Sequence, residues 1–300
     1  MKPQHFALAV GVSAIGGFQF VVLKVGLGEF PPVLFAVARF VLVIAILSPY
    51  LRRVPGRMIE IAVIAVFFGV LHYPLMFLGV KLSSGISSVA IAVQLYAPFS
   101  VLIAALFLRE RVGRRRLVGL ALAFGGVVVI GFEPSVYERL TAFFCVVGGA
   151  LSIGLAIVLI ARTQGIPILT LQAWMALMSV GPLLLLSLAF EGNPAEALAG
   201  ADWLQWATVA YTAIAGTILS HGGWYYLQRI YPVSVVSTLL LMAPVFGVAL
   251  GMLVFGEVLT WRFLLGAAAT LAGVVAIANA GARRAAAAPA AHPNRPPARL

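Results

Sequence analysis

Charged side chains and cysteine are scarce in this 300-residue chain. Lysine, arginine, aspartate and glutamate together supply 10% of the residues, whereas an average soluble domain has about 25%. The chain is therefore too poor in charge to be a soluble globule. Cys145 is the only cysteine and lies within an apolar run, which excludes an intrachain disulfide and a CxxC metal site. We interpret Cys145 as a small packing residue.

Long apolar runs fill the sequence instead. Hydrophobic residues make up 62% of the chain, and the mean hydropathy is +1.08. A bilayer core needs about 20 apolar residues per helix, and the runs are continuous rather than alternating, which favours helices over a β-barrel. We predict an all-α polytopic membrane protein whose ten transmembrane helices lie at residues 4–24, 31–50, 58–80, 86–108, 115–132, 138–160, 168–189, 203–227, 233–255 and 261–280.

The two ends of the chain differ from the apolar middle. The first run, from Phe6 to Leu23, is similar to a signal peptide but has no clear small-x-small cleavage site before the next span. It is therefore predicted to be a retained first helix. Residues 282–300 are rich in alanine, proline and arginine, which predicts a disordered cytoplasmic tail.

Positive charge dominates, with a formal net charge of +11. The charges lie in short gaps between apolar runs and at the C-terminus, not on an amphipathic face with stacking aromatics, so we predict no nucleic-acid partner. Fifteen lysines and arginines fall on one side of the ten-span topology, and four (Lys24, Lys81, Arg139 and Arg262) fall on the other. The positive-inside rule then predicts a multi-pass protein of the cell (inner) membrane with both termini in the cytoplasm.

One sequence pattern occurs twice. Glu110, Gly119 and Gly126 return 147 residues later as Glu257, Gly266 and Gly273, with similar residues around them. The chain is therefore divided into a first repeat at residues 1–135 and a second repeat at residues 136–281. Each repeat has five spans, and an odd number reverses direction, so the second repeat is inverted in the membrane. Inverted repeats are a usual construction of secondary transporters that work by alternating access.

Two prolines mark repeated positions inside the spans. Ala97-Pro98 in the fourth span matches Ala243-Pro244 in the ninth. A mid-span proline removes a backbone hydrogen bond and frees carbonyl groups. Such groups are tolerated only against protein or a watery cavity. The fourth and ninth spans are therefore predicted to line a central cavity.

The chain resembles the drug/metabolite transporter (DMT) superfamily, EamA type. The resemblance covers residues 1–280 and is carried by Phe20-Val-Val-Leu-Lys24-Val-Gly, by Pro31-Pro32 with Arg39-Phe40, and by the glycines that follow Glu110 and Glu257. It implies the EamA fold and the export of amino acids or small metabolites; some members move nucleotide sugars or drugs. The chain is most similar to exporters of O-acetylserine and cysteine. Family members often have Trp-Gly just before the polar residue of the first span, where this chain has Gly16-Gly17-Phe18-Gln19.

Polar side chains within spans are costly and usually face a cavity or a partner helix. They supply the candidate substrate site, and large aromatics supply its walls. The spacing aligns Gln94 with Pro98 on one face, and Thr217 with His221, Trp224 and Gln228 on another. By the repeat, His221 corresponds to Tyr73. The candidate residues are Gln19, His72, Tyr73, Gln94, Tyr96, Trp174, His221, Trp224 and Tyr225.

Structural roles compete with these assignments. The polar groups can form interhelical hydrogen bonds, and the tryptophans can pack against lipid or other helices. Only one of His72 and Tyr73 is expected to point inward, because adjacent helix residues do not share a face. Arg39, inside the second span, either binds a substrate carboxylate or caps carbonyls and snorkels toward the cytoplasm. Glu110 and Glu257 lie at helix ends, which favours a structural role.

These observations together predict a secondary exporter of a small metabolite, in contact with the lipid bilayer, as a monomer or weak homodimer. No cofactor or metal is expected. Proton coupling and uncoupled transport both remain open, since histidine titrates near neutral pH but no carboxylate lies at mid-membrane. A membrane enzyme would need a catalytic dyad or a metal cluster, and none is present in the sequence. The alternatives are a carrier of aromatic amino acids, nucleotide sugars or drugs, and a passive channel.

Overall fold

The computed structural model describes residues 1–287 except 29, 108–111, 164, 232–235, 237–238 and 240. Every regular element in this part of the chain is helical. The elements in chain order are α1 (Pro3–Gly26), α2 (Pro32–Leu47), η1 (Ser48–Tyr50), α3 (Met58–Ala65), η2 (Val66–His72), α4 (Tyr73–Leu82), α5 (Ser87–Ala92), η3 (Val93–Leu95), α6 (Tyr96–Phe107), α7 (Arg114–Gly131), α8 (Pro134–Tyr137), α9 (Leu140–Ile160), α10 (Ile168–Phe190), α11 (Pro194–Ala199), α12 (Trp203–Ala213), η4 (Ile214–Leu219), α13 (Ser220–Ile230), α15 (Met242–Phe255) and α16 (Trp261–Ala287).

Most of the predicted spans are helices long and apolar enough to cross a bilayer. Seven segments of the described chain meet this criterion: Pro3–Gly26, Pro32–Tyr50, Met58–Leu82, Ser87–Phe107, Leu140–Ile160, Ile168–Phe190 and Trp261–Gly281. The helix α15 is apolar but shorter. The other two predicted spans coincide with α7, which begins with three arginines, and with the α12–η4–α13 rod. The prediction of an all-α polytopic membrane protein is confirmed.

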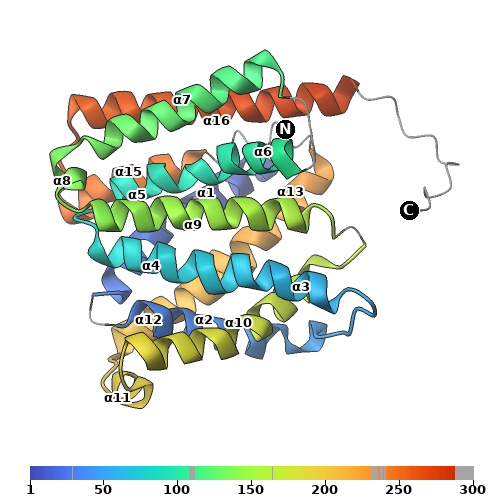
Figure 1. Cartoon of the computed structure of the whole chain (residues 1–300), viewed down its shortest axis with the longest axis vertical. Coiled ribbons are helices and arrows are strands. Elements are labelled where there is room, and N and C mark those ends of the chain that lie inside the picture. Colours follow the sequence, from blue (N-terminus) through green and yellow to red (C-terminus); the bar gives the residue numbers. More distant parts are fainter. Residues whose placement is uncertain are drawn as a thin grey trace, which may run out of the picture.

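Successive passes alternate in direction across the bundle (Figure 1). The N-terminal end of α1 and the C-terminal end of α16 consequently lie toward the same end of the molecule. Two arginine-containing loops meet at this end, where Arg57 donates a hydrogen bond to the carbonyl of Arg162 at 3.1 Å. That this end faces the cytoplasm stays a prediction from the charge count.

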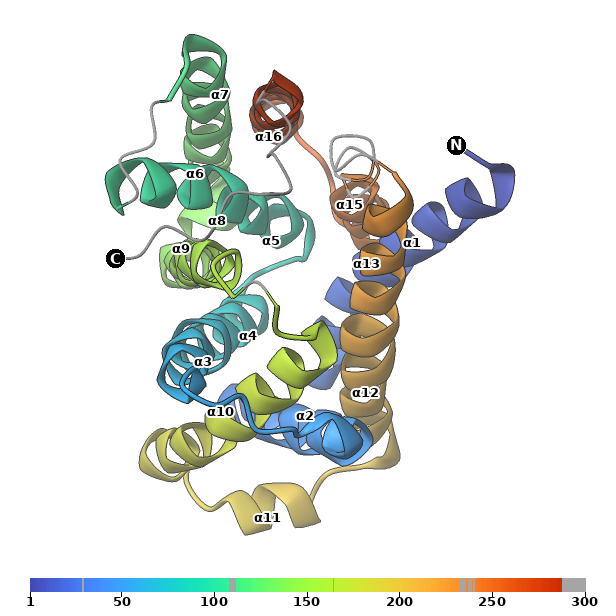
Figure 2. The ribbon, with the colours of Figure 1, turned by 90° about the vertical axis from the view of Figure 1, so that its right-hand side faces the viewer.

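Helices α7 and α16 lie side by side along one edge of the bundle (Figures 1 and 2). A Cβ added at Gly126 would overlap the carbonyl oxygen of Gly266, and one added at Gly119 would lie 2.9 Å from the carbonyl oxygen of Gly273. Residue numbers rise along one helix as they fall along the other, so the pair is antiparallel. Because the contacting glycines are those of the 147-residue repeat, an antiparallel contact relates the two repeats by a twofold axis perpendicular to the helices.

The remaining helices follow the same relation. Helix α1 packs against α15 and against the α12–α13 rod, while α9, the first long helix of the second repeat, packs against α6 and α4. Figure 2 shows α1 with α12, α13 and α15 on one side of the bundle and α9 with α3 and α4 on the other. Helices α2 and α10 pack against each other at the edge opposite α7 and α16. The largest apolar core surrounds α2 and includes Phe35, Phe40 and Phe77.

Candidate functional site

Two spans change from α-helical to π-helical geometry midway along their length. The segment η2 follows α3, and η4 follows α12, at corresponding places in the two repeats. Gly69 in η2 and Gly216 in η4 are 147 residues apart, which is the spacing of the repeat. Single π-helical turns inside α-helices occur frequently at functional sites. The sequence-based prediction did not include these segments, because a π-helical turn leaves no change in hydropathy.

Both glycines are close contact points between helices. A Cβ at Gly69 would overlap the hydroxyl of Ser179 on α10, and a Cβ at Gly216 would overlap the side-chain amide of Gln19 on α1. Ser179 is fully buried, and Gln19 is half-buried. The predicted site residue Gln19 therefore lies directly against a π-helical segment of the other repeat.

Arg39 lies beside the second π-helical segment. Its side chain projects from α2 and is 1% exposed. The Nε atom donates to the carbonyl oxygen of Thr212 at 3.3 Å, and Nη2 donates to the Thr217 hydroxyl at 2.5 Å and to the Tyr73 hydroxyl at 2.9 Å. We call Arg39, Tyr73, Thr212 and Thr217 the Arg39 cluster. It joins α2 and α4 of the first repeat to α12 and η4 of the second.

Aromatic rings surround the guanidinium group. Its central carbon lies 4.0 Å from the centre of the Tyr73 ring, 5.6 Å from that of Phe40 and 6.0 Å from that of Phe77. A cation held over an aromatic face is attracted by the ring quadrupole. The side chain is thus positioned by hydrogen bonds on its polar edge and by stacking on its face.

No carboxylate among the residues that the structure describes pairs with Arg39. In this part of the chain Arg57 forms an ion pair with Glu60 at 2.8 Å, and each described acidic residue lies at or near the end of a helix. The Nη1 atom of Arg39 is buried and has no hydrogen-bond partner there. Unpartnered buried polar groups are rare in native proteins, and each requires an explanation.

The two adjacent candidates His72 and Tyr73 point to different neighbours. Tyr73 bonds to Arg39, whereas Nδ1 of His72 lies 2.9 Å from the carbonyl oxygen of Gly149 on α9. Since that oxygen only accepts, Nδ1 is the protonated ring nitrogen. Gln94 is buried in η3, the short 3₁₀ turn that precedes Pro98, and η3 contacts α9 and α16.

The aromatic candidates lie at several depths. Trp174 donates from Nε1 to the carbonyl oxygen of Arg52 at 2.9 Å, in the loop that follows η1, so it lies toward one end of the bundle. Tyr96 packs against the main core. Trp224 packs near Ala9 at the start of α1. The side chains of His221 and Tyr225 lie outside the described residues.

The offset between the repeats changes by one residue across the π-helical segments. η2 begins at Val66 and η4 at Ile214, 148 residues later, which is the offset that pairs Tyr73 with His221. Because η2 has seven residues and η4 has six, the first residues after them, Tyr73 and Ser220, are 147 apart. The buried hydroxyl oxygen of Ser220 has no hydrogen-bond partner among the described residues.

Sequence reasoning named Arg39 but left its role open, and it placed Thr217 on a polar face without making it a candidate. The signal for Arg39 is its position, since it is the one lysine or arginine that the prediction places away from the ends of a span. Its association with Thr217 and Tyr73 depends on the packing of α2 against α4 and η4, which no local pattern predicts.

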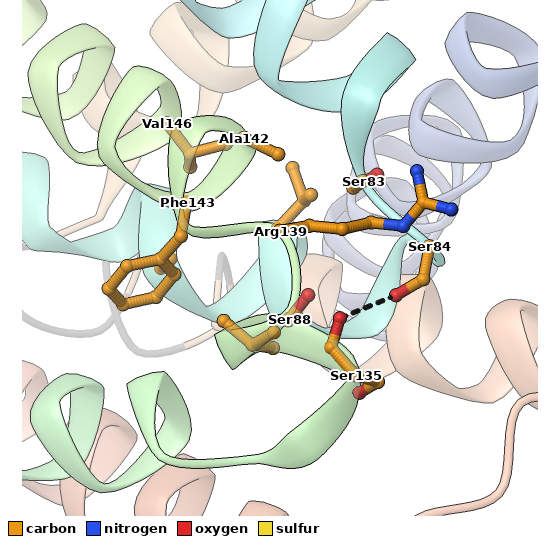
Figure 3. Close-up of a pocket in the computed structure, with 11 residues that line it drawn as sticks. Ser83, Ser84, Ser88, Ser135, Arg139, Ala142, Phe143 and Val146 are labelled. Atoms are coloured by element: carbon orange, nitrogen blue, oxygen red, sulfur yellow. Dashed lines mark hydrogen bonds between the residues drawn. The ribbon is translucent and has the colours of Figure 1, made fainter.

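A small pocket lies at the end of the bundle opposite the N-terminus. It is lined by Ser83, Ser84 and Ser88 and by Ser135, Arg139 and Phe143, and the Arg139 side chain extends toward Ser83 and Ser84 (Figure 3). The Ser84 hydroxyl donates to the carbonyl oxygen of Ser135 at 3.1 Å. The volume is about 10 Å³, which is enough for about one water molecule. This pocket is therefore too small for a metabolite.

The chain was compared with known proteins. The sequence pattern of the EamA-like transporter family matches residues 5–132 and again residues 140–279. A "Probable amino-acid metabolite efflux pump" of Salmonella typhimurium is 31% identical over 278 residues, which cover 89% of this chain and 92% of the relative. A protein of Escherichia coli with the same description is 27% identical and covers 91% of this chain and 94% of its own length.

Solved structures agree on the fold. One crystal structure matches 95% of this chain and 99% of its own chain with a TM-score of 0.61 at 18% sequence identity. At that identity the likeness concerns the fold alone. The two family matches, which together span nearly the whole chain, agree with the resemblance drawn from the repeated residues. The chain belongs to the EamA-like transporter family, within the DMT superfamily.

Proposed function

We propose that this protein is a secondary transporter that exports amino acids or their derivatives across the cytoplasmic membrane by alternating access. O-acetylserine and cysteine are the first solutes to test, since the chain resembles exporters of these compounds. The proposal is supported by the two relatives described as probable amino-acid metabolite efflux pumps, which align over most of their length.

The observation that carries the proposal is the Arg39 cluster. The guanidinium group of Arg39, which is costly to bury, lies midway along its span at a contact between the two repeats. Polar and ionisable residues inside membrane segments mark substrate or ion pathways by default. In inverted-repeat carriers the substrate site lies near the midplane, between the repeats. Rocking of one repeat against the other would therefore open the Arg39 cluster to one side of the membrane at a time.

The arrangement in the cell follows from the charge distribution. We place both termini and the arginine-rich loops in the cytoplasm of a cell (inner) membrane protein, with repeats at 1–135 and 136–281. The protein acts without a cofactor, as a monomer or weak homodimer. Other solutes of the superfamily, such as aromatic amino acids, nucleotide sugars or drugs, are the second choice within the same mechanism.

Counterflow in proteoliposomes tests the proposal. Vesicles that contain the purified protein are loaded with an unlabelled L-amino acid, and uptake of the same labelled amino acid is followed. A carrier gives transient accumulation above equilibrium, because the loaded solute returns the binding site to the outside. A passive channel gives equilibration without accumulation. The proposed function is rejected if no amino acid accumulates in a panel that includes O-acetyl-L-serine and L-cysteine.

A further inference from the structure

The repeat provides an internal control for the role of Arg39. Ala65 and Thr212 are 147 residues apart, and their carbonyl oxygens lie where the helix changes from α to π geometry. The hydroxyl of Ser179 lies 3.3 Å from the oxygen of Ala65 and makes a shorter hydrogen bond, at 2.7 Å, to the carbonyl oxygen of Met175, and both of these neighbours are neutral. The hydroxyl of Thr217 donates to the oxygen of Thr212 at 3.0 Å, in addition to Arg39. A neutral hydroxyl is therefore sufficient at such a carbonyl, and the positive charge of Arg39 is not required there.

The charge of Arg39 is costly where it lies. Arginine cannot lose its proton in a protein, and an ionised group buried without a partner costs several kcal/mol after relaxation. Stacking on Tyr73 and the hydrogen bonds to neutral groups offset only part of this cost. Since no described carboxylate pairs with Arg39, the site carries a positive charge that only an anion can neutralise.

Nη1 of Arg39 retains two N–H donors and has no hydrogen-bond partner among the residues that the structure describes. Nη2 of the same guanidinium group is already bonded to Thr217 and Tyr73, so the Nη1 donors are the ones left for a ligand. The planar guanidinium fork matches the two oxygens of a carboxylate.

We propose that Arg39 binds the carboxylate group of the transported solute through Nη1. Tyr73 and Thr217 hold the guanidinium in place through Nη2. The inference rests on the proposed function and deepens it, because it specifies solutes that carry a free carboxylate and rejects their amides and decarboxylated amines. It also makes both repeats contribute to one site, since Arg39 lies on α2 and Thr217, which holds its guanidinium group, lies on η4.

Competition in the counterflow assay tests the inference. Uptake of a labelled L-amino acid that passes that assay is measured against the unlabelled acid, its carboxamide and its decarboxylated amine, for example L-cysteine, L-cysteinamide and cysteamine under reducing conditions. We expect the acid to compete about tenfold or more better than either analogue, as for loss of a hydrogen bond to a charged group. Arg39→Gln is expected to abolish this preference, and Arg39→Lys to retain part of it.

Ser179→Ala is the matched control, because it removes a neutral hydroxyl beside the repeat-related carbonyl and leaves the charge unchanged. The acid-to-amide ratio should stay as in the wild type. If Arg39→Gln does not elute as a folded protein in gel filtration, the inference is tested by the acid-to-amide competition ratios of the wild type and of Arg39→Lys. Equal competition by acid and amide in the wild type overturns the inference while the proposed function stands. Absence of counterflow with every amino acid tested rejects the proposed function and, with it, the inference.

Discussion

The carboxylate of Glu257 accepts hydrogen bonds from the backbone N–H groups of Ile86 and Ser87, at 2.5 and 3.0 Å, although 170 residues separate Glu257 from Ser87. Glu257 follows α15, and the two N–H groups begin α5. An acidic group at a helix N-terminus satisfies free donors and interacts favourably with the helix dipole. These two hydrogen bonds agree with the structural role that the sequence favoured for Glu257. They join the two repeats at one end of the bundle. The corresponding Glu110 lies outside the described residues.

Glu257→Ala should loosen this end of the bundle. Ala90, in α5, is 1% exposed and lies against Gly247 of α15. We introduce Ala90→Cys into a Cys145→Ser background and measure labelling by a membrane-impermeant maleimide. Adding Glu257→Ala should raise the labelling rate several-fold, since loss of a charge-assisted contact costs about 1.5–3 kcal/mol. An unchanged rate would show that Glu257 does not hold the ends of α5 and α15 together.

Two neighbouring glycines should respond differently to the same substitution. A Cβ at Gly126 would overlap the backbone of α16, whereas one at Gly125 has no atom of a packed element within 4 Å. Gly126→Ala must therefore separate α7 from α16 and is expected to destabilise the protein by about 1–3 kcal/mol. Gly125→Ala is expected to be neutral or slightly stabilising, because alanine favours a helix more than glycine does. Thermal unfolding in detergent compares the two variants, and equal shifts would contradict the packing of α7 against α16.

Lys24 completes the C-terminal end of α4. Its Nζ donates to the carbonyl oxygens of Val80, Lys81 and Ser83 at 3.0, 3.3 and 2.5 Å. Lys81 makes a single bond of this kind, to the oxygen of Phe30 at 3.1 Å. Lys24→Met should therefore lower the thermal midpoint more than Lys81→Met does, because more terminal carbonyls lose a charged donor. The reverse order would mean that the bonds of Lys24 contribute little to stability.

Tyr73 and Trp174, both predicted as site residues, should behave differently in transport. Tyr73→Phe removes an acceptor of Arg39 in the buried cluster and is expected to reduce the rate of counterflow several-fold. Trp174→Phe removes one exposed hydrogen bond to a loop carbonyl and should change the rate less than twofold. Loss of transport in Trp174→Phe, with normal protein yield, would return Trp174 to the substrate pathway.

The sequence alone determined the class of the protein and the order of its spans. Hydrophobic runs of bilayer length specify membrane helices wherever they fold, because lipid leaves the backbone few alternatives. The repeated glycines at 119, 126, 266 and 273 were visible in the sequence as a pattern, and the structure shows that they bring α7 against α16, where close helix packing requires small residues.

Only the tertiary structure decided which polar residues meet. Arg39, Tyr73 and Thr217 are far apart in sequence, and they come together because α2 packs beside two spans that switch to π geometry at Val66 and Ile214. At the second switch Arg39 donates to the carbonyl oxygen of Thr212, a contact supplied by another helix. Hydropathy is nearly uniform along these spans, so the sequence fixes which segments enter the membrane, whereas packing between helices fixes which face of each segment meets its neighbours.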